Sequence, residues 1–341
     1  MLFRSPHPNA PWPLRQSAVA VHDLDADGSP EILVGLTVLD ANGSLLFRDP
    51  TQANEFGADP TIFYLWIRPV AADLDGDGTL EVLFGYVTYD ADGTERWRLD
   101  TTPGFAHPAD FDGDGLPEIL FTNSLGLWLL TAEGEVIWGP TMPPDEAEPP
   151  RFGCWVHPAA IVDVDGDGLP EALINTCDKR FVARIELSGP TILVSEEVAI
   201  TTAFGAPENG STAFDFRGHG PDWLAHDHKD LTLYEGMGPG VFKRISGDYI
   251  QDVGIPIVVD VDNDGSADVV VVDMNWNRLR VYEDAQKRHS PARRIWNQWN
   301  YWGSNVREDA TIPAAVTMPW HSHGTFRTQL RRTCAGVVPA R

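Results

Sequence analysis

The stretch that decides the fold of this chain is Asp163-Val164-Asp165-Gly166-Asp167-Gly168-Leu169-Pro170-Glu171, followed by Ala172-Leu173-Ile174. Alternate carboxylates converge on one point only where the backbone turns sharply, and Gly168 permits that turn at low steric cost. Apolar residues precede and follow the loop, as is typical of buried strands. The loop therefore predicts a turn that joins two antiparallel strands and gathers several carboxylate oxygens.

The same loop occurs five times along the chain, starting at Asp23, Asp73, Asp110, Asp163 and Asp260. Its first, third, fifth and ninth positions are acidic in every copy, and its sixth position is Gly. With a degenerate copy at Asp215, the starting positions are separated by 50, 37, 53, 52 and 45 residues. A period in this range, with several short strands per unit, is typical of a β-propeller.

The oxygen-rich loops are typical of calcium sites. Calcium accepts six to eight oxygen ligands with flexible geometry, whereas magnesium prefers a strict octahedron and keeps much of its water. An EF-hand begins in the same way, but its bidentate acid falls at position 12 and a helix follows. Here the acid falls at position 9 and an apolar strand follows, so we predict five calcium sites of another kind.

This order of strand, Asp-x-Asp-x-Asp-Gly-x-x-(Asp/Glu) and apolar strand resembles the FG-GAP or VCBS repeat of integrin α-subunit propellers and many bacterial surface proteins. The resemblance covers roughly residues 18–284. It implies an all-β fold, a propeller of four-stranded antiparallel blades with calcium loops between the first and second strands. It also implies that positions 1, 3, 5 and 9 bind calcium through side chains and position 7 through its backbone carbonyl. The implied ligands are Asp23, Asp25, Asp27, Ser29, Glu31, Asp73, Asp75, Asp77, Thr79, Glu81, Asp110, Asp112, Asp114, Leu116, Glu118, Asp163, Asp165, Asp167, Leu169, Glu171, Asp260, Asp262, Asp264, Ser266 and Asp268.

The sixth copy keeps the glycines but places Arg217 and His219 where two carboxylates stand in the other loops. We expect no calcium there, because Arg217 can supply the positive charge by pairing with Asp215 or Asp222. The alternative is a functional His219 at a specialised blade.

A second turn, containing Gly43, Gly93 or Gly134, predicts a hairpin between the third and fourth strands of a unit. The aromatic residues Phe47, Trp97 and Trp138 follow these turns, and we expect them to pack between blades.

Six loops imply at least six blades. Members of the resembled family more often close with seven, so we expect seven and keep six as the alternative. We divide the chain into a propeller at residues 1–284 and a Trp/Asn-rich C-terminal segment at residues 285–341 that packs on the propeller or closes it. Closure would remove exposed sheet edges. The segment carries Trp296, Trp299, Tyr301 and Trp302, which suit internal packing or, alternatively, sugar binding.

The formal net charge of −25 links the loops to stability, because they hold twenty of the 50 acidic residues. Without metal these carboxylates repel one another, so calcium binding and folding should be coupled. Sites with a dissociation constant of about 0.1 mM in about 1 mM calcium would each add roughly 1.4 kcal/mol, or about 7 kcal/mol together. Such sites fill outside cells, which predicts an extracellular or cell-surface protein.

Two features bear on cellular context. The segment starting at Met1 contains no apolar signal-peptide region, which a fragment, a processed chain or a domain cut from a larger protein would explain. We expect the chain to be part of a larger secreted protein. Cys154 and Cys177 flank one predicted hairpin, so either a disulfide or two reduced thiols are open alternatives, with Cys334 unpaired.

The sequence favours binding over catalysis. It contains no nucleophile elbow, phosphate loop or zinc spacing, and its acidic character disfavours nucleic acid. The pairs His226/His228 and His321/His323 are more typical of surface residues than of a metal site. We predict a non-enzymatic, calcium-binding adhesion or protein-interaction module with a protein or glycan partner. The alternatives are a carbohydrate-binding, lectin-like propeller, and a polysaccharide-acting enzyme on the same scaffold.

Overall fold

The computed structural model describes residues 18–50, 68–142, 158–176, 179–197, 210–226, 230–236, 241–246, 255–273, 278–322, 325–329, 331–333 and 336–338. Within these ranges the protein is an all-β structure, and its one helix is the single turn α2 (Pro319–Ser322). No helix in the described ranges is both long and apolar enough to cross a membrane.

Three four-stranded antiparallel sheets make up the first part of the chain. The first sheet contains β1 (Val19–His22), β2 (Glu31–Val34), β3 (Thr37–Leu39) and β4 (Leu45–Arg48). The second contains β5 (Val70–Ala72), β6 (Glu81–Leu83), β7 (Val87–Tyr89) and β8 (Glu95–Arg98). The third contains β9 (Gly104–Ala109), β10 (Glu118–Asn123), β11 (Gly126–Leu130) and β12 (Val136–Thr141).

Three further antiparallel sheets of three or four strands follow. The fourth sheet contains β13 (Ala160–Val162), β14 (Glu171–Asn175), β15 (Lys179–Glu186) and β16 (Gly189–Glu197). The fifth contains β17 (Ser211–Phe214), β18 (Asp222–His226), β19 (Asp230–Tyr234) and β20 (Val241–Ser246). The sixth contains β21 (Ile257–Val259), β22 (Asp268–Asp273) and β23 (Arg278–Tyr282). A separate hairpin pairs β24 (Arg331–Thr333) with β25 (Gly336–Val338).

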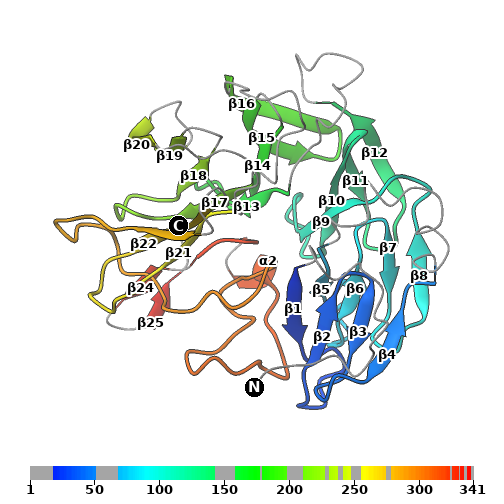
Figure 1. Ribbon diagram of the computed structural model, residues 1–341. Coiled ribbons are helices and arrows are strands. Elements are labelled where there is room, and N and C mark those ends of the chain that lie inside the picture. The colour runs from blue at the N-terminus through cyan, green and yellow to red at the C-terminus, as the bar shows by residue number, and fades with distance from the viewer. Residues whose placement is uncertain are drawn as a thin grey trace.

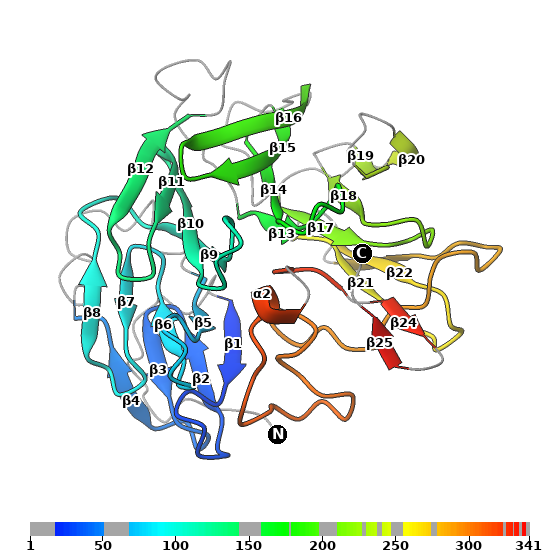
Figure 2. The same cartoon turned by 180° about the vertical axis from the view of Figure 1, so that it is seen from behind.

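The six sheets follow one another around the molecule in chain order (Figures 1 and 2). Their first strands are neighbours: β5 contacts β9, β9 contacts β13, β13 contacts β17, and β17 contacts β21. In every sheet the strands lie side by side in chain order, as expected for blades built from successive hairpins. The arrangement is propeller-like and places the equivalent loops of successive sheets in equivalent positions.

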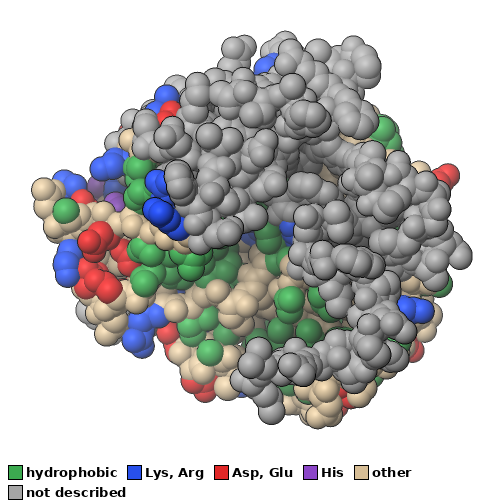
Figure 3. Space-filling model, viewed as in Figure 1, with side chains coloured by type: hydrophobic (Ala, Val, Ile, Leu, Met, Phe, Trp, Pro, Cys, Tyr) green, Lys and Arg blue, Asp and Glu red, His purple; other side chains and the backbone are tan. Residues whose placement is uncertain are grey.

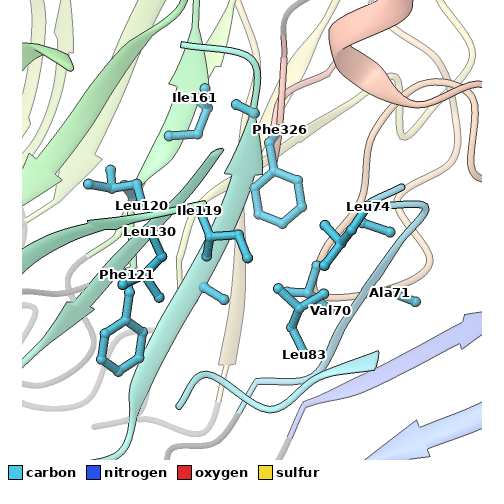
Figure 4. Packing of buried hydrophobic residues seen from close by; sticks show 14 of the residues in the cluster. Val70, Ala71, Leu74, Leu83, Ile119, Leu120, Phe121, Leu130, Ile161 and Phe326 are labelled. Atoms are coloured by element: carbon cyan, nitrogen blue, oxygen red, sulfur yellow. The ribbon is translucent and has the colours of Figure 1, made fainter. Parts of the chain in front are cut away.

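Apolar residues on both faces of the inner strands hold neighbouring sheets together. Strands β10 and β11 are buried along their whole length, whereas the outer strand β12 is partly exposed. Figure 4 shows Val70 and Leu83 of the second sheet near Ile119 of the third, with Phe326 of the C-terminal segment alongside. Strands covered on both faces require continuous apolar runs, which is the pattern that the sequence has after each acidic loop.

Aromatic residues on the fourth strands also join the sheets, which confirms the expected packing of Phe47, Trp97 and Trp138. Phe47 lies against Tyr89 of the next sheet, with 5.7 Å between ring centroids. Trp97 donates a hydrogen bond to the carbonyl oxygen of Ala132, and Trp138 donates one to that of Glu186. Each side chain reaches from one sheet to the next.

The described residues form six sheets of three or four strands, so the preferred count of seven blades is not confirmed. After β23 the chain turns at Asp284, whose carboxylate pairs with Arg288 at 2.8 Å. It then returns to the loop between β21 and β22, where Ala267 N donates to Ser290 O and Asp260 N donates to Arg293 O. The C-terminal segment therefore lies between β21–β23 and β1 without forming a further blade within the described ranges (Figures 1 and 2).

The C-terminal segment contacts the first strand of a sheet, or the residue just after it, in all six sheets. The contacts near the start of the segment are Trp299 N to Val19 O and Val21 N to Gln298 Oε1. Further along the segment, Asp73 N donates to Met318 Sδ, and Gln329 Nε2 donates to Val258 O. The rings of His107 and Phe326 are in contact, and β-bridges pair Ile161 with Phe326 and Ala213 with Thr328. The boundary at residue 284 remains a prediction.

The three cysteines Cys154, Cys177 and Cys334 lie outside the described residues, so their redox state remains a prediction. His228 and His323 also lie outside the described residues, as do residues 1–17 of the predicted propeller. His321 lies in α2 and is exposed.

Candidate metal centres

Each acidic loop joins the first and second strands of a sheet, as the repeat predicts. The acid at position 9 is in every case the first residue of the second strand: Glu31, Glu81, Glu118, Glu171 and Asp268. Pairing with the first strand fixes its backbone, for example in the pair Glu171–Val162. The strands thus hold one carboxylate rigidly, and the loop folds the others back over it.

Backbone N–H groups orient the loop carboxylates, and the fourth loop shows the pattern. Asp163 accepts hydrogen bonds from Gly166 N at 2.7 Å and Gly168 N at 3.0 Å. Glu171 Oε2 accepts one from Val164 N at 2.9 Å, which ties the ninth position to the second. The ninth acid makes this same bond in all five loops. The turn is therefore organised by the chain itself.

Three carboxylates converge in each loop, with one oxygen of each within 4.8 Å of the others. The clusters are Asp23, Asp25 and Asp27; Asp73, Asp75 and Glu81; Asp110, Asp112 and Glu118; Asp163, Asp165 and Glu171; and Asp260, Asp262 and Asp268. The structure thus brings the predicted side chains of positions 1 and 3 together in every loop, with position 9 in four loops and position 5 in the first. The other ligand assignments remain predictions. They are binding through the side chains of Asp77, Asp114, Asp167, Asp264 and Glu31, and through the carbonyls of Ser29, Thr79, Leu116, Leu169 and Ser266.

Burial and charge repulsion disfavour the ionised form of the ninth acid. Burial, with smaller contributions from the neighbouring aspartates, raises the pKa of Glu31, Glu81, Glu118 and Glu171 to about 7. Burial also raises the pKa of Asp268. A cation among these oxygens would offset both effects.

The donor sets fit a hard divalent cation. All the converging atoms are carboxylate oxygens, the ligand type that calcium prefers. In the first loop, Asp23 Oδ1 is buried and has no hydrogen-bond partner, so a cation bound there would satisfy it. Figure 3 shows acidic side chains gathered near the edge where Figure 1 draws β21–β23.

The sixth loop is neutralised by arginine, as predicted. Arg217 Nη2 lies 2.7 Å from Asp222 Oδ1, and Arg217 also pairs with Glu235. Asp215 instead pairs with Arg331 of the C-terminal segment, with 3.0 Å between Nη1 and Oδ2. His219 is exposed, so its alternative role gains no support from burial or convergence.

Two arginines at the loops were missed by sequence reasoning. Arg96, in β8, contacts Asp75 at 2.8 Å and Glu81 at 3.1 Å. Arg184, in β15, contacts Asp165 at 2.5 Å and Asp167 at 3.0 Å. Neither arginine lies within a loop motif, so the motif gave no signal of these contacts. Arg96 and acidic residues of the first two loops also line a cavity of about 600 Å³.

The aromatic residues of the C-terminal segment pack internally. Trp296 stacks on Tyr301 with 4.8 Å between ring centroids, and Trp302 is buried against His22 at 5.4 Å. The guanidinium groups of Arg68 and Arg327 both lie over the ring of Trp299. These contacts favour the packing interpretation of the aromatic residues over sugar binding.

Comparison with solved structures supports the fold. The biofilm matrix protein Bap1 of V. cholerae is similar with a TM-score of 0.61 and 16% identity, covering 94% of this chain and 78% of that protein. An Agrocybe aegerita lectin that recognises terminal N-acetylglucosamine has a TM-score of 0.43 and 15% identity, covering 79% of this chain and 80% of the lectin. The Bacillus licheniformis rhamnogalacturonan lyase PL11 has a TM-score of 0.36 and 15% identity, covering 85% of this chain and 62% of the lyase. The last two likenesses are too weak to support an argument.

No curated protein sequence matches this chain. A family model does: residues 99–174 match the FG-GAP-like repeat. The matched region runs from the end of the second sheet through the third and fourth acidic loops. The chain therefore contains an FG-GAP-like repeat, as its acidic loops indicated.

Proposed function

We propose that this protein is a calcium-stabilised β-propeller that acts as a non-enzymatic extracellular adhesion or protein-interaction module. The observation that carries the proposal is the convergence of three carboxylates in each of five loops, all between the first and second strands of a sheet. Repetition at equivalent positions argues for a shared structural ion rather than for one specialised catalytic centre. The FG-GAP-like repeat supports the same assignment.

We further propose that the ring has six blades and that the C-terminal segment closes it. The segment bonds to β1 through Trp299 N and to the β21–β22 loop through Arg293 O. It thereby joins the first and last sheets, which would protect the edges of the ring. Its contacts with all six sheets support this role.

An extracellular location would suit calcium sites of modest affinity. Loops of this kind with dissociation constants near about 0.1 mM would be filled outside cells and largely empty in the cytosol. A biofilm matrix protein uses a similar fold, which is compatible with an extracellular setting. Every described tryptophan is buried or half-buried, so none of them offers a freely exposed ring for stacking on a sugar. They are Trp97, Trp128, Trp138, Trp223, Trp296, Trp299, Trp302 and Trp320.

The proposal is tested first by metal analysis and thermal melting in millimolar calcium and after dialysis against EGTA. We expect about five bound calcium ions and a large fall in melting temperature on chelation. Binding to immobilised extracellular proteins and polysaccharides, with and without calcium, then tests the interaction role. Absence of bound calcium would contradict the metal assignment, and release of new reducing or unsaturated ends from polysaccharide would contradict the non-enzymatic one.

A further inference from the structure

In two of the five acidic loops, an arginine contacts the carboxylates that converge. In the second loop, Arg96 Nη2 lies 2.8 Å from Asp75 Oδ2, and Nη1 lies 3.1 Å from Glu81 Oε1. Asp75 and Glu81 are two of the three carboxylates that converge there. The guanidinium group therefore contacts two of the carboxylates that a metal ion would use.

The fourth loop repeats this arrangement from a different strand. Arg184 contacts Asp165, Asp167 and Glu171, at 2.5, 3.0 and 3.6 Å. The backbone of Arg184 is paired directly with that of Glu171 across β14 and β15. Its side chain is 32% exposed, and that of Arg96 is 22% exposed, so neither is a freely solvated surface group.

The first and third loops differ. Among the described residues, no basic side chain forms an ion pair with a carboxylate of the loops starting at Asp23 and Asp110. In the fifth loop, Lys287 Nζ lies 2.8 Å from Asp264 Oδ2 but contacts none of the three converging carboxylates. The Lys287 side chain is 59% exposed and can move into solvent at little cost.

We propose that Arg96 and Arg184 compete with calcium for the second and fourth loops, so that the chain fills with calcium in two stages. The inference rests on the proposed calcium function and deepens it. The first, third and fifth loops fill at low calcium. The second and fourth fill only at higher calcium, when the ion displaces the guanidinium group from the carboxylates.

The size of the effect follows from charge repulsion. A divalent ion and a guanidinium group held about 6 Å apart in a water-like dielectric repel strongly enough to weaken binding about tenfold. The repulsion persists after displacement, because the strands keep each arginine nearby. Arg96 has a third acidic neighbour, Asp90, at 3.5 Å and outside the loop, toward which it can turn. Without calcium the same arginines relieve repulsion within their loops.

The experiment is a calcium titration by calorimetry of the wild-type chain, Arg96→Met, Arg184→Met and the double variant. Met keeps an apolar stem and removes the charge, and Arg→Gln variants serve where a Met variant fails to fold. Arg288→Met is the matched control, because Arg288 is exposed and pairs with Asp284, outside every loop. Asp112→Ala and Asp165→Ala assign the stages to the third and fourth loops.

We expect two binding stages in the wild-type chain, and a weak stage that becomes about tenfold tighter in the double variant but not in Arg288→Met. Asp112→Ala should delete a site from the tight stage, and Asp165→Ala one from the weak stage. The double variant should have a lower melting temperature than the wild type in EGTA but not in saturating calcium. If the arginines had a purely structural role, the melting temperature would fall under both conditions. A single stage that the Arg variants leave unchanged would overturn the inference while leaving the calcium sites intact. Absence of calcium binding in every variant would instead overturn the proposed function.

Discussion

Asp112 and Asp215 show how neighbouring residues decide the role of an acid in two related loops. Asp112 converges with Asp110 and Glu118, and no described basic side chain pairs with it. Asp215 lies in the corresponding turn of the fifth sheet but pairs with Arg331, 116 residues away in sequence. The first arrangement concentrates negative charge, and the second neutralises it.

Substitution at these two positions should therefore have different effects on bound metal. Asp112→Ala should lower the calcium stoichiometry by one and the free energy of unfolding in calcium by about 1 to 2 kcal/mol. Asp215→Ala should leave the stoichiometry unchanged. Metal analysis and melts of both purified variants provide the measurement, and equal loss of metal in both would contradict the assignment of the sixth loop.

At the scale of elements, turns and aromatic side chains fix how sheets meet. Gly134 lies in the turn between β11 and β12, with φ of +83°, against Trp97 of the preceding sheet. A Cβ atom at Gly134 would overlap the Trp97 ring. Gly43 has nearly the same backbone conformation, with φ of +85°, but a Cβ atom added there would have no other atom within 4 Å.

Gly134→Ala should consequently destabilise the protein far more than Gly43→Ala. Both variants carry the cost of a positive φ, about 1 kcal/mol, but only Gly134→Ala also forces Trp97 to move, adding about 1 to 3 kcal/mol. Chemical denaturation monitored by tryptophan fluorescence measures the difference. Equal destabilisation of the two variants would show that the turn does not pack on Trp97.

His107 joins the third and fourth sheets through a hydrogen-bond pair that requires a neutral ring. It is buried, its Nδ1 donates to Leu120 O at 2.9 Å, and its Nε2 accepts from Ala159 N at 2.9 Å. Burial lowers the pKa of His107 to about 3. Because this value is below that of the unfolded chain, about 6.5, the stabilisation is present above pH 6.5 and is lost as the pH falls toward 3.

We expect His107 to account for a loss of about 2 kcal/mol in the free energy of unfolding between pH 7 and pH 5. His107→Gln keeps a donor and an acceptor but cannot be protonated, so its unfolding free energy should fall less over this range. Denaturation of both proteins at a series of pH values isolates the contribution of His107 from that of other groups. If the unfolding free energies of the two proteins changed in parallel with pH, the contribution assigned to His107 would be contradicted.

At the scale of the whole molecule, a buried arginine connects the C-terminal segment to the last sheet. Arg293 is 1% exposed and donates to Tyr301 Oη, Gly303 O and Val306 O, and its Nε lies 2.6 Å from Glu308 Oε1. Its own carbonyl accepts from Asp260 N at the fifth acidic loop. One residue thus organises the segment and ties it to the last sheet.

Arg293→Met should lower the free energy of unfolding by about 3 kcal/mol or more, because it removes the donor to the carbonyl oxygens of Gly303 and Val306 and the partner of Glu308. Arg294→Met is the control, since Arg294 is adjacent in sequence and exposed. If the segment closes the ring, Arg293→Met should also increase proteolysis of the first and last sheets. Equal melting temperatures and equal proteolysis rates for the two variants would argue against that closing role.

The sequence by itself determined the repeating unit of this protein. Acidic residues at fixed spacing, a glycine at the turn and apolar runs on both sides are local features, and they predicted the loops, their position between two strands, and the neutralisation of the sixth copy by Arg217. The expected contacts of Phe47, Trp97 and Trp138 followed from their place after a hairpin turn. These predictions succeeded because short-range geometry and burial on both faces impose them within one unit.

Only the tertiary structure decided what happens between units. Arg96 and Arg184 reach the loops from other strands, and Arg331 reaches Asp215 from the end of the chain. The C-terminal segment contacts the first strand of each sheet or the residue just after it. Such contacts depend on how the sheets are arranged around the centre, and no residue spacing encodes them. The count of seven blades, preferred from the resemblance, is likewise not confirmed, because closure depends on packing between the two ends of the chain.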